Sequence, residues 1–144
     1  MNDFFLYHGV KHDLVDRIAL QGFDERYAGE HFGKLFGSGV YFAKNASKSD
    51  IYTTPDLNGN RSIFLSRVCL GETHTTTVSM STVNRPPERS DKRGPKNSVR
   101  AEIMSNGGCV EFLEYIIYRG AQAYPEYCIT YKHEPGCACT HCCK

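Results

Sequence analysis

The sequence predicts an α+β domain built mainly on an antiparallel β-sheet. Short apolar runs of strand length outnumber the runs with helical spacing. The joins between these runs are mostly short and rich in Gly and Pro, which is typical of antiparallel neighbours. The chain has 144 residues, of which 40% are hydrophobic and 23% charged, so we expect one folded domain with a substantial core.

Two short helices are predicted. Apolar residues recur at helical spacing across residues 11–21, and Gly22 follows them as a C-terminal stop. Further along the chain, Asn45 is expected to cap a second short helix that ends near Tyr52.

The remaining apolar and β-branched runs predict strands. The first is expected to end where His8 and Gly9 begin, and residues 23–38, 53–61 and 84–97 are expected to be loops or turns. The predicted strands cover residues 4–7, 40–43, 62–70, 73–80, 112–118 and 126–132.

Composition excludes several classes of function. No apolar run approaches the roughly 20 residues that a membrane helix needs, and the first residues do not resemble a signal peptide. The net charge of +1 does not indicate a general nucleic-acid-binding surface. Residues 80–100 nevertheless hold six basic and two acidic residues, which fits either a solvated loop or a patch for an acidic partner.

Glu114 is the most informative single residue. It sits within a predicted strand that is apolar on both faces, so its carboxylate is expected to be removed from water. Such carboxylates mark either a functional site or a salt bridge. His8 follows an apolar strand and is either a core histidine or a ligand-binding one, while Gly9 lets a ligand approach the backbone closely.

Tyr41 and Tyr52 flank a short predicted helix that carries Lys48 and Ser49. If this segment turns back over the strand before it, the two rings face each other across a flat slot. Such a slot, lined by a hydroxyl and a peptide group, suits a planar aromatic amide. A cationic ring would gain about 0.5–2 kcal/mol from each aromatic face. Taken singly, both tyrosines also fit ordinary sheet packing.

Four motifs in order resemble the catalytic domain of poly(ADP-ribose) polymerases, the diphtheria-toxin-like ADP-ribosyltransferases, over residues 4–132. Residues 22–26 and 118–127 look most like the tankyrase branch. The resemblance implies two packed antiparallel sheets with short flanking helices. The four motifs are Leu6-Tyr-His-Gly9, Gly33-Lys-Leu-Phe-Gly-Ser-Gly-Val-Tyr-Phe-Ala43, Ser47-Lys-Ser-Asp-Ile-Tyr52 and Glu114-Tyr-Ile-Ile-Tyr118.

The resemblance also implies NAD⁺ as the ADP-ribose donor. By this match His8, Tyr41 and Glu114 form the signature triad of the family, and Lys48 lies near the reacting ribose. His8 would form a hydrogen bond with the adenosine ribose, and the Gly9 backbone and the Ser49 hydroxyl would hold the nicotinamide carboxamide. Tyr41 and Tyr52 would stack on the pyridinium. Gly22 and Asp24 would open a loop that covers the adenine side.

The chain departs from the family pattern in two places. Val10 stands where the family usually has Ser or Thr, which removes one hydrogen bond to the adenosine ribose, worth about 0.5–1.5 kcal/mol. Relatives carry an earlier strand and helix, whereas this chain begins seven residues before His8. We therefore expect an N-terminally short form with a bare sheet edge, or a fragment.

Residues 133–144 form a Cys/His-rich tail after the catalytic domain expected at residues 1–132. The spacing of Cys139 and Cys142 is that of a zinc knuckle, and the proposed Zn²⁺ ligands are Cys137, Cys139, His141 and Cys142. A reactive, metal-free tail is the alternative. Clustered rather than distributed cysteines favour a reduced, intracellular location, cytoplasm or nucleus.

The function expected is transfer of ADP-ribose from NAD⁺ to a protein acceptor with release of nicotinamide. Transfer of a single unit is favoured over polymer synthesis because the chain is small. Two alternatives stay open: ADP-ribosylation of nucleic acid, against which the near-neutral charge argues, and a catalytically weak module that binds NAD⁺ or ADP-ribose.

Overall fold

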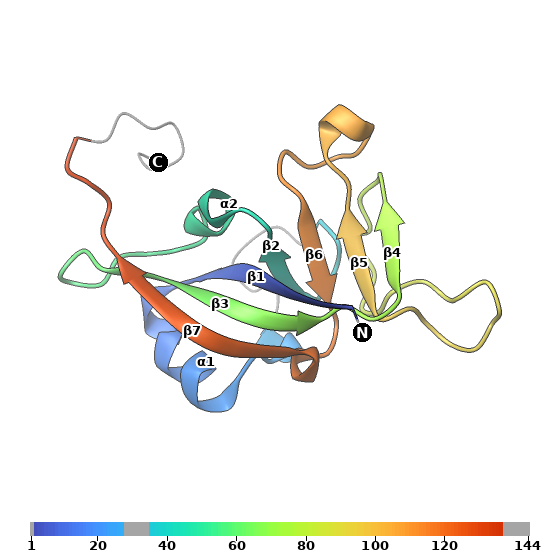
Figure 1. Cartoon of the computed structure of the whole chain (residues 1–144), viewed down its shortest axis with the longest axis horizontal. Coiled ribbons are helices and arrows are strands. Elements are labelled where there is room, and N and C mark those ends of the chain that lie inside the picture. Colours follow the sequence, from blue (N-terminus) through green and yellow to red (C-terminus); the bar gives the residue numbers. More distant parts are fainter. Residues whose placement is uncertain (1, 28–34, 137–144) are drawn as a thin grey trace.

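A computed structural model describes residues 2–27 and 35–136 and confirms the α+β class. Strands dominate, and the helices are short (Figure 1). Four single 3₁₀ turns, η1 to η4, cover His12–Leu14, Glu25–Tyr27, Met104–Asn106 and Gly120–Gln122. The main elements are β1 (Asp3–Val10), α1 (Val15–Gln21), β2 (Val40–Ala43), α2 (Ala46–Asp50), β3 (Arg61–Cys69), β4 (Thr73–Thr76), β5 (Ser98–Ala101), β6 (Glu114–Ile117) and β7 (Ala123–Tyr131).

The described strands join in a single seven-stranded sheet with the order β4-β5-β6-β2-β1-β3-β7. All neighbours pair antiparallel except β4 and β5, which are parallel. Only Tyr7 and Ala43 pair between β1 and β2, and β1, β3 and β7 run across the direction of the other strands (Figure 1). The two packed sheets expected from the resemblance are thus two halves of one bent sheet.

The first strand is longer than predicted because its pairing with β3 does not stop at His8. Eight consecutive pairs run from Asp3 opposite Cys69 to Val10 opposite Ser62. Gly9 weakens the local strand propensity, but the nine-residue partner strand holds it in the ladder. Beyond Tyr7, β2 no longer pairs with β1, and this divergence leaves room for a cleft on that side.

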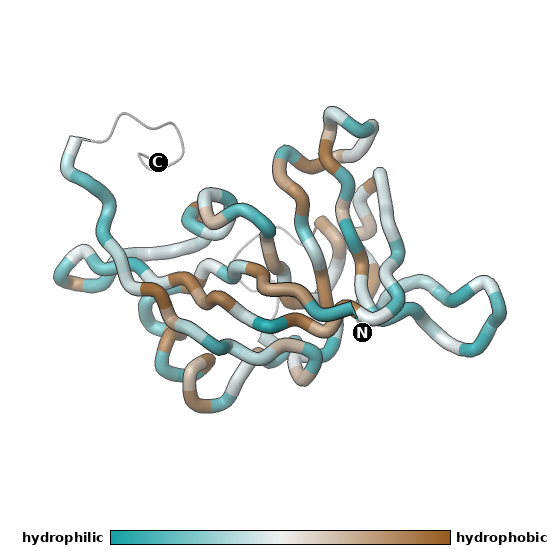
Figure 2. The backbone as a smooth tube through the Cα atoms, viewed as in Figure 1, coloured by the Kyte–Doolittle hydropathy of each residue, from teal (hydrophilic) through white to brown (hydrophobic). Residues whose placement is uncertain are grey.

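The apolar core has two parts. The larger cluster includes Leu6, Phe42 and Phe64 and lies under the β1-β3 half, where α1 contributes Ile18. The smaller cluster centres on Phe36, Val99 and Ile116. Figure 2 shows hydrophobic residues along the central strands and a hydrophilic loop between β4 and β5.

Besides β1, the largest differences from the predicted strands are at β4, β5 and β7, while the limits of β3 and β6 shift by only one or two residues. β4 ends at Thr76 instead of residue 80, because the Thr76 hydroxyl bonds the backbone of Val78 and turns the chain. β5 was missed, since it is only four residues long and follows a loop rich in Pro and charge. β7 starts at Ala123 instead of residue 126, because a register shift that skips Glu126 places Pro125 opposite Ser66, and proline is tolerated on this edge strand.

The predicted helices are confirmed. α1 ends at Gln21, and Gly22 follows at φ 76° with its N–H bonded to the Ile18 carbonyl at 2.8 Å. Asn45 precedes α2 in the N-cap position but makes no side-chain cap hydrogen bond. No helix within residues 2–27 and 35–136 has the length and apolar character needed to cross a membrane.

Candidate active site

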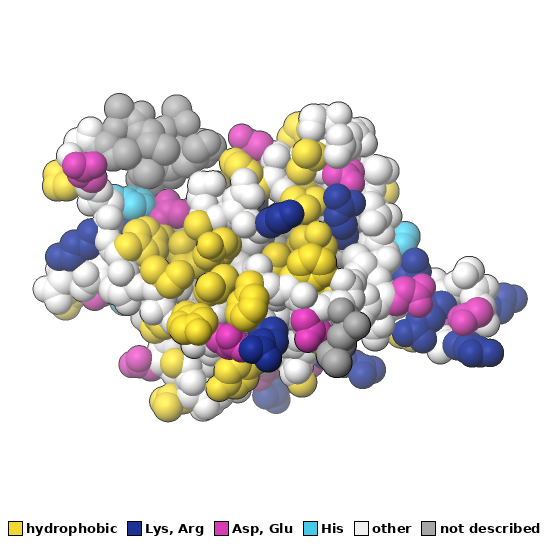
Figure 3. Space-filling view, viewed as in Figure 1, with side chains coloured by type: hydrophobic (Ala, Val, Ile, Leu, Met, Phe, Trp, Pro, Cys, Tyr) yellow, Lys and Arg dark blue, Asp and Glu magenta, His cyan; other side chains and the backbone are white. Residues whose placement is uncertain are grey.

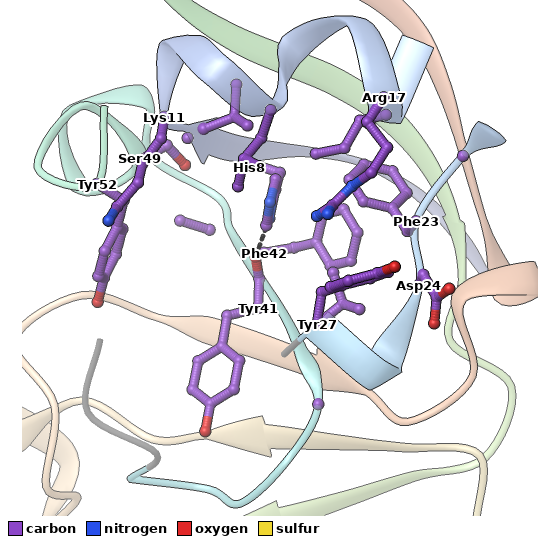
Figure 4. Close-up of a pocket in the computed structure, with 18 of the residues that line it drawn as sticks. His8, Lys11, Arg17, Phe23, Asp24, Tyr27, Tyr41, Phe42, Ser49 and Tyr52 are labelled. Carbon is purple, nitrogen blue, oxygen red and sulfur yellow. Dashed lines mark hydrogen bonds between the residues drawn. The ribbon is translucent and has the colours of Figure 1, made fainter. Parts of the chain in front are cut away.

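A cleft opens where β1 and β2 diverge, with α1 and α2 on its two sides (Figure 4). The cleft brings together residues from five separate parts of the chain. All but one of the predicted catalytic and NAD⁺-binding residues line it, namely His8, Gly9, Gly22, Asp24, Tyr41, Ser49, Tyr52 and Glu114. The remaining one, Lys48, contacts two of them.

Glu114 reaches the cleft from the first position of β6. The β2–β6 register sets it opposite Ala43, two residues beyond Tyr41. The residue is only 4% exposed, as its place in an apolar strand predicted. Burial raises the pKa of Glu114 above its ordinary value, and the positive charge of Lys48 opposes that shift.

Lys48 joins Glu114 to the aromatic side of the cleft. Its Nζ lies 3.8 Å from Glu114 Oε1 and 5.4 Å from the centre of the Tyr52 ring. Both side chains of the ion pair are mostly buried, at 18% and 6% exposure. In surroundings of reduced dielectric such a pair interacts more strongly than it would on the surface. Lys48 therefore helps to keep the Glu114 carboxylate ionised.

Tyr41 and Tyr52 stand on either side of an open space in the cleft (Figure 4). The Tyr41 hydroxyl is fixed by two backbone hydrogen bonds, from the Phe36 N–H and to the Gly37 carbonyl, each of 2.8 Å. Burial is the main reason that the pKa of Tyr41 rises to about 12. The phenol is thus neutral, and its ring is held by β2 rather than by α2.

His8 packs between two phenylalanines. The ring centres of Phe23 and Phe42 lie 5.0 and 5.4 Å from that of His8. Burial lowers the pKa of His8, and the hydrogen bond to the Tyr41 carbonyl only partly compensates. The Nδ1–H donates that bond at 2.7 Å, so in the neutral ring Nε2 is left as an acceptor.

Gly9 is required by packing as well as by any ligand. A Cβ at this position would lie 1.7 Å from the Ser49 carbonyl oxygen, far inside contact distance. The last turn of α2 therefore lies directly on the β1 backbone. This contact explains how Ser49, which is 2% exposed, is fixed beside the strand, and sequence reasoning had assigned Gly9 to ligand approach alone.

The far end of the cleft contains a cation that sequence reasoning missed. The Arg17 guanidinium lies 3.8 Å from the centre of the Tyr27 ring, and both residues line the cleft (Figure 4). Arg17 follows Leu14 by three residues and so shares the inward face of the helix, which was the available signal. Nearby, Arg26 binds the Asp24 carboxylate and lowers its pKa to about 2.

Val10 occupies the position where the resemblance expected a hydroxyl. It is 3% exposed and belongs to the larger core cluster, yet it also borders the cleft. The cleft wall is therefore apolar at this point.

The basic segment at residues 80–100, which fits either a solvated loop or a patch for an acidic partner, is largely neutralised by its acidic neighbours. Arg89 and Lys96 both approach Glu72, at 3.0 and 3.6 Å, and Arg85 lies 3.4 Å from Glu88. Figure 3 shows blue and magenta side chains interleaved on this projecting part of the surface. The net charge of the segment therefore overstates its attraction for an anion.

The proposed zinc ligands Cys137, Cys139, His141 and Cys142 lie outside the described residues. Within residues 2–27 and 35–136 no group of three or more His, Cys, Asp or Glu side chains could hold a metal ion.

The α+β fold is consistent with that of the ADP-ribosyltransferases, and comparison with known proteins specifies the family. Residues 1–133 match the family model described as the poly(ADP-ribose) polymerase catalytic domain, so the chain belongs to the PARP catalytic-domain family. It is 32% identical over 136 residues to human protein mono-ADP-ribosyltransferase PARP14, covering 92% of this chain and 7% of that protein.

Two further relatives carry similar names. Mouse protein mono-ADP-ribosyltransferase PARP10 is 31% identical over 134 residues, covering 89% of this chain and 13% of the relative. Human protein mono-ADP-ribosyltransferase PARP12 is 34% identical over 126 residues, covering 88% of this chain and 16% of that relative. This chain thus spans between 7% and 16% of the length of these relatives.

The tankyrase-like branch suggested by the sequence motifs is not supported by these relatives, which are not tankyrase-like. The motifs that suggested it, residues 22–26 and 118–127, are two short stretches. The similarity to the mono-ADP-ribosyltransferases extends over most of the chain.

Proposed function

We propose that this chain transfers a single ADP-ribose unit from NAD⁺ to a protein acceptor and releases nicotinamide. The observation that carries the proposal is the position of Glu114. Its buried carboxylate borders a cleft that also contains two tyrosine rings, and Lys48 lies 3.8 Å away. A carboxylate held in this way suits the stabilisation of positive charge that develops on a ribose.

The nicotinamide half of NAD⁺ fits the α2 side of the cleft. The Ser49 hydroxyl and the backbone of Gly9 would bind the carboxamide, which has both a donor and acceptor atom. Tyr41 and Tyr52 would take the pyridinium between their rings. A neutral His8 would accept a hydrogen bond from the adenosine ribose.

The adenosine half fits the opposite end. Gly22 and Asp24 line the cleft there and would cover the adenine. Asp24 is bound by Arg26, so it would shape the loop rather than bind the ligand through a free carboxylate. Arg17 is the cation available near the diphosphate among the described residues that line this end.

The chemistry follows from these positions. The bond between the ribose C1′ and the pyridinium nitrogen breaks, and its electron pair leaves with the nitrogen as neutral nicotinamide. The ribose acquires oxocarbenium character. Glu114 would accept a hydrogen bond from the 2′-hydroxyl, which strengthens as that charge grows. An acceptor nucleophile then bonds to C1′ and gives up its proton to solvent or a nearby base.

Two features support a protein acceptor and single transfer. The relatives described above are named protein mono-ADP-ribosyltransferases, and the net charge of +1 does not favour nucleic acid. The test is mass spectrometry after incubation of the purified chain with NAD⁺ and candidate protein or nucleic-acid acceptors. Free nicotinamide with a single ADP-ribose adduct on protein supports the proposal. An adduct on nucleic acid, serial adducts, or NAD⁺ binding without nicotinamide release each contradicts it.

Two further predictions from the sequence remain proposals of their own. Zinc binding by the tail rests on its Cys/His spacing alone, and elemental analysis of the purified chain with and without residues 134–144 tests it. Equal, negligible zinc in both forms removes the proposal. The intracellular location, cytoplasm or nucleus, also rests on cysteine usage, and microscopy of the tagged chain tests it.

A further inference from the structure

The helix that carries Lys48 and Ser49 cannot hold its own position. α2 has five residues, and its N-cap Asn45 makes no side-chain cap hydrogen bond. Helices this short are not stable without tertiary contacts. Tertiary contacts between α2 and the rest of the protein must therefore place both side chains in the cleft.

One such contact is formed by the last residue of the helix. Asp50 is 9% exposed, and its Oδ1 accepts a hydrogen bond from the Tyr131 hydroxyl at the end of β7. His133 Nε2, two residues further on, donates to the same oxygen at 2.7 Å. Burial and the bond to Asp50 raise the pKa of Tyr131, so its hydroxyl stays protonated and able to donate.

The turn after α2 is held as well. The Thr53 hydroxyl donates to the Asp50 carbonyl at 2.7 Å. Arg61, the first residue of β3, donates to the Thr53 carbonyl and hydroxyl at 2.8 and 3.0 Å. The Asp50 carboxylate thus attaches α2 to the end of β7, and its carbonyl is linked to β3 through Thr53.

Asp50, through which α2 is attached, is close in sequence to Lys48 and Ser49. Ser49 immediately precedes Asp50, and its carbonyl rests against Gly9. A shift of Asp50 would therefore move the Ser49 hydroxyl along the cleft and change the 3.8 Å approach of Lys48 to Glu114. Displacements near 1 Å are enough to cost a reaction about 10²-fold.

We infer that Asp50, Tyr131 and His133 form a clasp that positions Lys48 and Ser49 for the reaction. The three are positioning residues because they act through α2. None of them is among the described residues that line the cleft. The inference rests on the proposed function. It places part of the control of the active site at the C-terminal end of β7, outside the four motifs that carry the predicted catalytic residues.

The test removes single donors from the clasp. Tyr131→Phe keeps the ring and loses the hydroxyl, while His133→Ala loses the donor and His133→Gln supplies another amide donor near the same place. Tyr124→Phe is the matched control, because Tyr124 lies on the same strand and is 68% exposed. Each variant is assayed for kcat/KM with NAD⁺ and for nicotinamide affinity, at a temperature well below its measured Tm.

The clasp predicts that kcat/KM and nicotinamide affinity fall about tenfold in Tyr131→Phe and in His133→Ala. His133→Gln should recover most of the loss, and Tyr124→Phe should match the wild type. A fall in Tm alone, with kcat/KM and nicotinamide affinity unchanged, would mean a purely structural role and overturn the inference. If Tyr131→Phe does not fold, the two His133 variants decide.

Failure of the proposed function has a different signature. A wild-type chain that releases no nicotinamide from NAD⁺ contradicts the transferase, and the clasp is then judged by nicotinamide affinity in the same variants. A wild type that neither turns over NAD⁺ nor binds nicotinamide overturns both.

Discussion

Lys48 and Glu114 form an ion pair across the cleft, with 3.8 Å between Nζ and Oε1, although they come from elements 66 residues apart in sequence. Burial and the charge of Lys48 act on the pKa of Glu114 in opposite directions. Burial raises the pKa of Glu114, and Lys48 limits that rise. The ionised carboxylate that the proposed reaction needs therefore depends on the lysine.

Replacing Lys48 should change the pH dependence of turnover. In Lys48→Gln the positive charge is gone, so the pKa of Glu114 rises further and its ionised fraction falls at a given pH. If turnover requires the ionised carboxylate, the acid limb of kcat should move to higher pH in this variant. Lys44→Gln, at an exposed position just before α2, should leave the limb in place. An unmoved limb in Lys48→Gln contradicts the role given to the pair.

Some features of the fold and the site could be predicted from the sequence, and others could not. The burial of Glu114 was predictable because its strand is apolar on both faces, and β2 was predicted with its observed bounds because it is a compact apolar run. The parallel pairing of β4 with β5 was not, since the two are separated by a long polar loop. The contact between Asp50 and Tyr131 spans 81 residues, and no local pattern encodes it.

Gly9 illustrates a further limit. Sequence reasoning recognised that a side chain was absent and assigned the space to a ligand. The structure shows that the Ser49 carbonyl already uses it. Only the packing of α2 on β1 distinguishes these readings, because glycine has the same local conformational freedom in both cases.

A substitution at Gly9 should therefore disturb both stability and binding. In Gly9→Ala the new Cβ meets backbone at 1.7 Å, so α2 must shift, at a cost of about 1–3 kcal/mol. Gly59→Ala is the control: it has open space but a φ of 82°, which costs about 1–2 kcal/mol. Denaturant unfolding should show similar losses for both, while calorimetry should show weaker nicotinamide binding only for Gly9→Ala. Equal nicotinamide affinity in the two variants would exclude the displacement of α2.

The ring of Tyr52 should matter more than its hydroxyl. If the pyridinium of NAD⁺ lies against this ring, Tyr52→Leu loses about 0.5–2 kcal/mol of cation–π attraction. That loss corresponds to an increase in KM for NAD⁺ of about twofold to thirtyfold. Tyr52→Phe keeps the aromatic face and should stay near the wild-type KM. Equal KM values in the leucine and phenylalanine variants would remove the ring from the binding site.

Ionisation of the buried Glu114 carboxyl should lower the stability of the fold. Its pKa is raised in the folded state, so between 4.5 and that raised value the folded chain binds more protons than the unfolded chain. Stability therefore falls as pH rises through this window. Glu114→Gln cannot ionise, so its Tm should exceed that of the wild type at pH 7 and the difference should shrink toward pH 4.5. A lower Tm at pH 7 for the variant would show that the ionised carboxylate stabilises the fold.

The most direct measurement of the central claim is the rate of nicotinamide release from NAD⁺ by three proteins: the wild type, Glu114→Gln and Glu111→Gln. Glu111 is an exposed carboxylate three residues earlier, so its loss should leave the rate unchanged. Loss of the Glu114 charge should lower kcat about 10²–10³-fold in a variant that is still folded. A Glu114→Gln protein that releases nicotinamide at the wild-type rate would contradict the assignment of this carboxylate to the reaction.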